Sequence, residues 1–194
     1  MPIIPDTKDW TWVLTEVCPE CGFDAAAVDV AEMGDLIRAN AAAWPSLVCH
    51  ERSGQRICDD RWSALEYGCH VRDVYRIFDQ RLQLMLDQDA PAFANWDQDA
   101  TAKADEYGRQ VPARVATDLL VAAAILADRF ESVTDSDWQR TGFRSDGVAF
   151  TVESFARYLL HDPVHHLHDV ACGNASLRTG TGTSTATGTA TGTA

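Results

Sequence analysis

Four long segments in which apolar residues recur every three or four positions constrain this chain more than any other feature. They span roughly residues 25–47, 62–87, 112–133 and 151–171. An amphipathic α-helix requires this spacing, because it gathers the apolar side chains on one face. Only 7 prolines and 12 glycines occur among 194 residues, so few helix breakers interrupt the middle of the chain. The sequence therefore predicts an all-α fold.

The connections between these segments indicate how the helices are arranged. Pro112 suits the first turn of the third helix, and Thr151 is a candidate N-cap for the fourth. About twenty residues separate the second and third segments, which is enough to cross a bundle from end to end. We therefore expect a four-helix bundle in which a long crossover lets helices two and three run parallel. Residues 138–147 are expected to form a loop or a short hairpin.

Composition divides the chain into three regions. Residues 1–24 are expected to be an irregular N-terminal segment containing a Cys-Pro-Glu-Cys motif, and residues 25–172 the bundle. Residues 173–194 are expected to be a tail, which from position 179 onward contains only Thr, Gly, Ala and one Ser. Such a segment has no large side chain to bury, so we expect it to be disordered.

The charge of the chain argues against several classes of partner. A net charge of −13 and the lack of a local basic cluster disfavour nucleic-acid binding, which depends on neutralising phosphates. No run approaches the roughly 20 apolar residues of a membrane span, and the N-terminus lacks the pattern of a secretion signal. We therefore expect a cytoplasmic protein with no membrane partner, whose six cysteines remain thiols or bind metal.

Five of the six histidines lie in two of the expected helices. His161 and His165 are four residues apart, so they share a helix face and can bind one ion, whereas His166 is turned about 100° away. A stable zinc site usually needs at least three protein ligands, and His70 on the second helix is the natural third. At this point other readings stay open: a buried structural histidine at position 70, a surface pair at 161 and 165, or a pH-sensitive patch.

Two stretches around these histidines carry a family resemblance. They are Trp62-Ser-Ala-Leu-Glu-Tyr-Gly-Cys-His70-Val-Arg-Asp73-Val and Leu159-Leu-His161-Asp-Pro-Val-His165-His166-Leu-His-Asp169-Val. In order and spacing they resemble the DinB-like superfamily, which includes mycothiol-dependent maleylpyruvate isomerases and bacillithiol transferases. The resemblance covers most of residues 25–171 and implies a four-helix bundle with a long crossover. It also implies a divalent metal held by one histidine of helix two and an H/E-x-x-x-H pair of the last helix. Carried over, these ligands fall on His70, His161 and His165.

Three further residues bear on this site. Pro163 lies between the two expected ligands of the last helix, where a proline removes a backbone hydrogen bond and should kink the helix. Asp73 and Asp169 are candidates to fix the tautomer of a ligating histidine through a hydrogen bond. The alternative is that each is solvated or pairs with a nearby arginine, which for Asp73 would be Arg72 or Arg76.

The Cys18-Pro-Glu-Cys21 motif resembles half of a tetrahedral zinc site. The other half is not evident, because Cys49 and Cys58 do not form a second motif of this kind. The alternatives are a redox-active pair, in which proximity lowers a thiol pKa, and thiols that only pack. The sequence does not decide among a zinc site, a redox-active pair and thiols that only pack.

Three functions are compatible with these features. The first is a metal-dependent enzyme, which the resemblance suggests transfers a low-molecular-weight thiol such as mycothiol to an electrophilic small molecule, or isomerises one. The second is a hydrolase using metal-bound water, and the third is a non-catalytic, metal-stabilised bundle that forms a homodimer or binds a partner. Zinc is the expected metal by prevalence, with nickel and iron as alternatives. Trp62, Tyr67 and Tyr158 are expected to line the substrate pocket.

Overall fold

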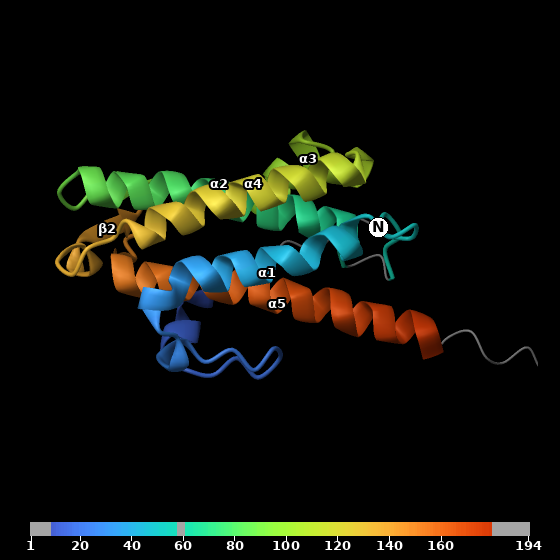
Figure 1. The fold of residues 1–194 in the computed structure, drawn as a ribbon, viewed down its shortest axis with the longest axis horizontal. Coiled ribbons are helices and arrows are strands. Elements are labelled where there is room, and N and C mark those ends of the chain that lie inside the picture. Colours follow the sequence, from blue (N-terminus) through green and yellow to red (C-terminus); the bar gives the residue numbers. More distant parts are fainter. Residues whose placement is uncertain (1–8, 58–60, 180–194) are drawn as a thin grey trace, which may run out of the picture.

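The computed structural model describes residues 9–57 and 61–179, with side chains described up to Gly173. Its four long helices are α1 (Met33–Val48), α2 (Ala64–Asp87), α4 (Pro112–Glu131) and α5 (Val152–Thr179). Figure 1 shows that α2 and α4 run in the same direction, while α1 and α5 run in the opposite one. The all-α bundle with a crossover between its second and third long helices is therefore confirmed.

The connections contain shorter elements. The crossover holds strand β1 (Ala92–Phe93), helix α3 (Gln98–Ala104) and the 3-10 turn η4 (Tyr107–Arg109). Strands β2 (Thr141–Arg144) and β3 (Ala149–Thr151) form the expected hairpin. Strand β1 pairs in parallel with β2, so the crossover is joined to the hairpin in a three-stranded sheet of order β1-β2-β3. The remaining 3-10 turns are η1 (Trp10–Leu14), η2 (Ala25–Ala27), η3 (Val30–Glu32) and η5 (Asp137–Gln139).

Two helix boundaries differ from the expected ones. Helix α1 begins at Met33 and not near residue 25, because Asp24 and Asp29 each cap a separate 3-10 turn that precedes it. Helix α5 continues to Thr179, so residues 173–179, which we assigned to the tail, are helical. Residues 180–194 lie outside the described part of the chain. Pro163 is buried inside α5, and the helix continues through it without interruption.

The bundle core lies between the layer of α1 and α4 and the layer of α2 and α5. Trp44, Tyr75 and Phe155 are among its largest fully buried side chains. One polar group joins the layers inside this core: the Asn40 side-chain oxygen accepts hydrogen bonds from Trp44 Nε1 at 3.0 Å and Tyr75 Oη at 2.9 Å. Both buried donors are thereby satisfied, as the low-polarity interior requires.

Helix α2 is fixed at its N-terminus and near its middle by polar contacts. Ser63 and Glu66 form a reciprocal capping box that starts the helix. Near the middle, Asp73 accepts hydrogen bonds from Arg72 at 2.8 and 2.9 Å and from Tyr107 Oη at 2.6 Å. Burial alone would raise the pKa of Asp73, but the hydrogen bonds from Arg72 and Tyr107 outweigh it and lower that pKa. Tyr107 belongs to η4, so this network also attaches the crossover to α2.

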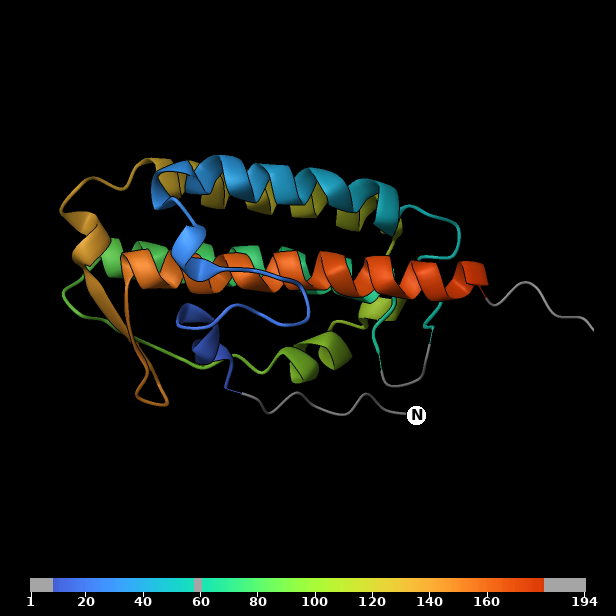
Figure 2. The same cartoon turned by 90° about the horizontal axis from the view of Figure 1, so that it is seen from below.

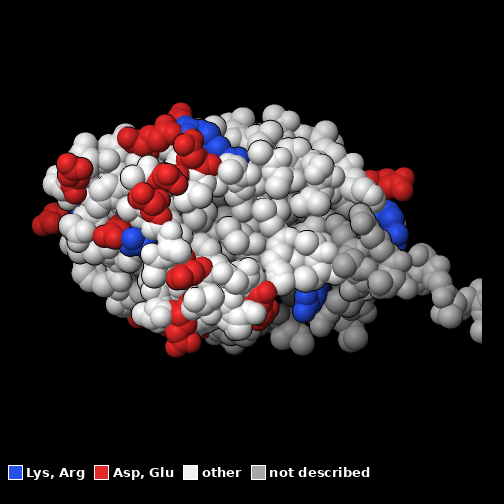
Figure 3. Space-filling view, turned by 60° about the horizontal axis from the view of Figure 1, so that its bottom comes forward, with Lys and Arg blue, Asp and Glu red and all other residues white. Residues whose placement is uncertain are grey.

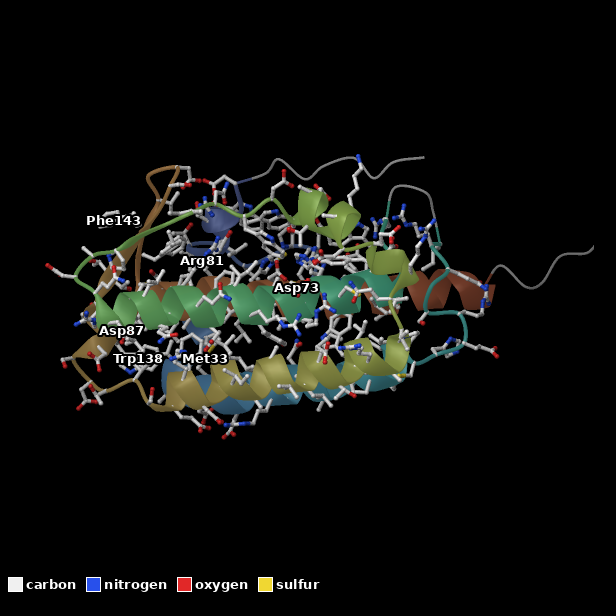
Figure 4. The ribbon with its side chains drawn as sticks, turned by 90° about the horizontal axis from the view of Figure 1, so that it is seen from above. Met33, Asp73, Arg81, Asp87, Trp138 and Phe143 are labelled. Atoms are coloured by element: carbon white, nitrogen blue, oxygen red, sulfur yellow. The ribbon has the colours of Figure 1, made fainter. Side chains whose placement is uncertain are left out.

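A third layer covers the outer face of α2 and α5. Figure 2 shows the N-terminal segment, α3 and the hairpin on the side of α5 that lies away from α1. The cover is built from turns and short elements. In Figure 4, Arg81 lies on the side of α2 that faces the crossover, whereas Met33 lies on the opposite, core side.

Replacing Asp73 by alanine should strongly destabilise the protein. Arg72 is only 5% exposed, so the substitution would leave a buried guanidinium without its carboxylate. We expect the free energy of unfolding to fall by about 3–5 kcal/mol in urea denaturation. Asp118→Ala is the matched control, because Asp118 pairs with the half-exposed Arg76 at 3.6 Å and should cost less than about 1 kcal/mol. Equal losses in the two variants would contradict a structural role for the buried network.

Candidate metal centre

Helix α5 presents its polar residues to two different neighbours. Successive residues of an α-helix are rotated by about 100°, so His161 and His165 share one direction while Asp162 and His166 share another. Asp162 and His166 meet His70 of α2, and His161 and His165 meet the cysteines of the N-terminal segment. The described residues therefore form two groups of candidate metal ligands on one stretch of helix.

The first group consists of His70, Asp162 and His166. The Nε2 atom of the fully buried His70 lies 3.3 Å from Asp162 Oδ1, and His166 Nε2 lies 3.7 Å from the same oxygen. Asp162 Oδ1 is buried and has no hydrogen-bond partner among the described residues. A carboxylate oxygen between two imidazole nitrogens, without a hydrogen bond of its own, fits a divalent metal. Two histidines and one carboxylate are a donor set that zinc and non-haem iron sites both use.

The charges within this group favour an ionised carboxylate. Burial opposes ionisation of Asp162, but the neighbouring His70 and His166 outweigh it and lower its pKa to about 2. Asp169, one turn farther along α5, places a carboxylate oxygen 3.0 Å from His166 Nδ1. Such a contact holds the ring in place and directs its other nitrogen toward Asp162, the side on which a metal would bind. Asp169 is thus in a position to orient His166, a histidine that the sequence analysis did not place among the ligands.

The second group consists of Cys18, Cys21, His161 and His165, whose candidate ligand atoms all lie within 4.8 Å of one another. Cys18 Sγ is 3.7 Å from His165 Nδ1. His161 Nε2 is buried and has no hydrogen-bond partner among the described residues. Burial and the neighbouring His165 lower the pKa of His161 to about 4, so this imidazole is neutral near pH 7. Neutral imidazole is the form that binds metals.

The structure does not bring the expected triad of His70, His161 and His165 together. It assigns His70 to one group and the other two histidines to the other. The reason is the rotation of α5, which turns Asp162 and His166 toward α2. The sequence contained the signal for this arrangement, because Asp162 and His166 are also four residues apart and the carboxylate variant of the family motif fits them. Spacing alone could not tell which of the two pairs faces α2.

The hydrogen bonds of Asp73 do not support the expected role of orienting a ligating histidine. Its hydrogen bonds go to Arg72, Tyr107 and Arg76, the last at 3.2 Å, so the alternative of pairing with arginine is what the structure shows. It supports the fold of α2 and the crossover.

A cavity of about 1030 Å³ opens beside both groups. Its walls come from α2 and α5 on one side and from the N-terminal segment, the crossover and the hairpin on the other. Asp162 and His166 line it, and so do the three aromatic residues expected at the substrate pocket, Trp62, Tyr67 and Tyr158. A ligand in the cavity would therefore contact aromatic rings and the first group of candidate metal ligands together.

Three arginines line the cavity, and Arg81 differs from the other two in having no carboxylate partner among the described residues. Arg61 lies 3.9 Å from Asp169, and Arg144 lies 2.8 Å from Asp146. Arg81 is 8% exposed and donates a hydrogen bond to the carbonyl of Ala94, but no carboxylate of the described residues lies within ion-pair distance of it. Burial lowers its pKa to about 10, so it still carries its charge near pH 7. An uncompensated buried cation in a cavity wall is suited to an anionic ligand.

The exterior has a different character from the cavity. Figure 3 shows a face on which acidic side chains outnumber basic ones, in keeping with the net charge of −13. None of the helices in the described ranges combines the length and apolar character that a transmembrane span requires.

Comparisons with known proteins agree with the fold. The family model described as the DinB superfamily matches residues 6–170. Among solved structures, YfiT from Bacillus subtilis, described as a probable metal-dependent hydrolase with an unusual four-helix bundle topology, is similar with a TM-score of 0.66. The two chains are 16% identical, and the match covers 77% of this chain and 86% of that one. No curated protein matches the chain.

The low pKa of His161 predicts how the metal-free protein responds to acid. Unfolded chains have a histidine pKa of about 6.5, so between about pH 6.5 and 4 the unfolded state binds a proton that His161 in the folded state does not. Stability should therefore fall as the pH falls through this window, by up to about 3 kcal/mol from this group.

The measurement is urea denaturation at pH 7.5 and pH 5 after treatment with a chelator. His161→Phe should reduce the difference between the two pH values, while His50→Ala, at an exposed position, should leave it unchanged. An equal pH dependence in wild type and His161→Phe would refute the buried neutral histidine.

Proposed function

The chain belongs to the DinB superfamily, and from that premise we propose that it is a metal-dependent enzyme whose metal is held by His70, Asp162 and His166. The observation that carries this proposal is that these three residues form one ligand group and that two of them line a large cavity. Three protein ligands would leave coordination positions open, as catalytic sites require, beside the cavity that Asp162 and His166 line. We propose zinc as the metal, with iron or nickel as alternatives, because histidine and carboxylate donors suit all three.

The residues around the group have distinct roles in this proposal. A divalent metal bound there would supply Lewis-acid activation of a small nucleophile. His70 and His166 would hold it through imidazole nitrogens and Asp162 through its carboxylate, while Asp169 orients the His166 ring through Nδ1. Trp62 and Tyr67 form part of the aromatic wall beside these ligands and keep water away from the reacting groups.

We propose that the substrate is a small anionic electrophile. Its acidic group would pair with Arg81, the buried guanidinium that has no carboxylate partner in the described ranges. A charged group bound there would lie in the same cavity as Asp162 and His166, and the aromatic residues of the same lining would contact the apolar part of the molecule. Binding at a distance from the reacting atoms is how an enzyme orients a substrate toward its catalytic groups.

We further propose that the nucleophile is a low-molecular-weight thiol such as mycothiol, which would make the protein a cytoplasmic thiol S-transferase or isomerase. The cavity of about 1030 Å³ is at the upper limit of single-ligand pockets, so it has room for a thiol and an electrophile together. A hydrolase is the second candidate, since the structurally similar YfiT is described as a probable metal-dependent hydrolase. In that case water would replace the thiol at the same ligands.

Metal content tests the ligand assignment. We expect Asp162→Asn and His166→Ala each to lose about one equivalent of metal by elemental analysis, because two remaining ligands do not hold a divalent ion firmly. His168→Ala is the matched control from the same helix, since His168 belongs to neither ligand group, and it should keep its metal. Full metal content in Asp162→Asn and His166→Ala would contradict the assignment of these residues as metal ligands.

Turnover tests the chemistry. The metal-loaded protein is mixed with mycothiol and a panel of electrophiles that carry a carboxylate, and free thiol is followed over time. We expect thiol-dependent turnover that Asp162→Asn abolishes. Product formed equally well without thiol would instead establish the hydrolase, and metal binding without any turnover would favour a non-catalytic role.

Arg81→Ala tests the anionic end of the substrate. Loss of a charged hydrogen bond costs about 1.5–3 kcal/mol, so KM for a carboxylate-bearing substrate should rise about 10–100-fold. Metal content should stay unchanged. Arg157→Ala, on α5 but outside the cavity lining, should have no effect on KM. An unchanged KM in Arg81→Ala would show that the anion binds elsewhere.

A further inference from the structure

The second ligand group points to a metal site of a different kind. We infer that Cys18, Cys21, His161 and His165 bind a structural zinc ion that fastens the N-terminal segment to helix α5. This site is separate from the group of His70, Asp162 and His166 and does not depend on the function proposed for that group. All four candidate ligand atoms lie within 4.8 Å of one another.

The backbone around the cysteines arranges both thiols on one side of a tight turn. The Gly22 N–H donates to the carbonyl of Cys18 at 2.8 Å, and the Cys18 N–H donates to the carbonyl of Phe23 at the same distance. Gly22 has a φ of +75°, a left-handed conformation that glycine adopts without strain. This C-x-x-C-G turn supplies two sulfur ligands, and the two histidines four residues apart on α5 supply two nitrogen ligands. Two cysteines and two histidines are a common zinc-binding set.

The environment of the four side chains requires a partner that the described residues do not supply. Cys18, His161 and His165 are 1%, 5% and 7% exposed, so all three are nine-tenths buried. His161 Nε2 accepts or donates no hydrogen bond within the described residues. A buried imidazole nitrogen without a partner is costly in a folded protein. A metal ion between the four side chains would satisfy it.

Other contacts around the group match those of established zinc sites. His165 Nε2, on the side of the ring away from Cys18, lies 3.7 Å from a Glu20 oxygen and 3.8 Å from an Asp169 oxygen. Carboxylates on the outer nitrogen commonly orient ligating histidines. The rings of Trp10 and Phe23 lie 5.3 and 5.4 Å from the His161 ring and shield it from solvent.

The same observations argue against a redox-active cysteine pair. A redox-active pair needs one thiol with a lowered pKa, so that it can attack as a thiolate. Burial raises the pKa of Cys21 to about 11, which is the opposite of the lowering that an attacking thiolate needs. Four protein ligands also leave no open position, which is typical of a structural site and not of a catalytic one.

Cobalt substitution tests this inference through a signal that only sulfur ligation produces. The full chain is expressed in cobalt-supplemented minimal medium, and the absorption spectrum of the purified protein is recorded. We expect strong near-ultraviolet thiolate-to-cobalt charge transfer together with the visible bands of a tetrahedral ion. Absence of the thiolate band from cobalt-containing wild-type protein would overturn the inference, and this measurement needs no substitution that could impair folding.

Variants then separate the two sites. Cys18→Ser and Cys21→Ser should lose the thiolate band and about one equivalent of metal, while Asp162→Asn should keep the band and lose the other equivalent. Cys49→Ser, at an exposed position outside both groups, is the matched control and should keep both metals. Loss of the thiolate band in Asp162→Asn would show a single shared site and would also overturn the inference. Failure of the catalytic proposal alone would appear as an intact thiolate band without turnover.

Discussion

The rotation of about 100° between successive residues of α5 is the constraint on which the site geometry depends. Because of it, residues 161 and 165 face the N-terminal segment while residues 162 and 166 face α2, although the two pairs are adjacent in sequence. One and a half turns of a single helix therefore serve two ligand groups. Pro163 lies inside the stretch that both pairs span, and it is buried within a helix that continues through it.

Burying polar groups on the outer face of α2 and α5 costs free energy unless they find partners. Some of these groups have partners within the protein, and others do not. Asp73 is fully satisfied by Arg72 and Tyr107, so it contributes to the fold. In Asp162 and His161 one buried side-chain atom has no hydrogen-bond partner in the described ranges, and the buried Arg81 has no carboxylate partner there. Buried polar groups without partners lower the stability of the folded state, and they usually occur at binding or catalytic sites. The contrast separates polar residues that are satisfied within the fold from polar residues that are candidates for binding on the same pair of helices.

The sequence predicted the bundle well because helical periodicity and connection length are local properties. The four helices, the crossover and the hairpin follow from them, whereas strand β1 depends on pairing with the distant β2 and had no local signal. The site was harder to predict. Spacing identified His161 and His165 as a pair, but Asp162 and His166 have the same spacing, and only the packing of α5 against α2 decides between them. The partners of Cys18 and Cys21 were missed for a similar reason, since 140 residues separate Cys21 from His161 in the chain.

The N-terminal segment packs as a part of the bundle, although its composition suggested a separate region. Trp10 and Glu20 line the cavity, and Cys18 lies against His165 of α5. The family match, which begins at residue 6, includes this segment as well. The four helices alone would leave Asp162 and His166 on an open surface, where water would compete for any metal or substrate bound there. Segments with little regular structure therefore complete the wall of the cavity above a general helical scaffold, and the contact of Cys18 with His165 joins this cover to α5.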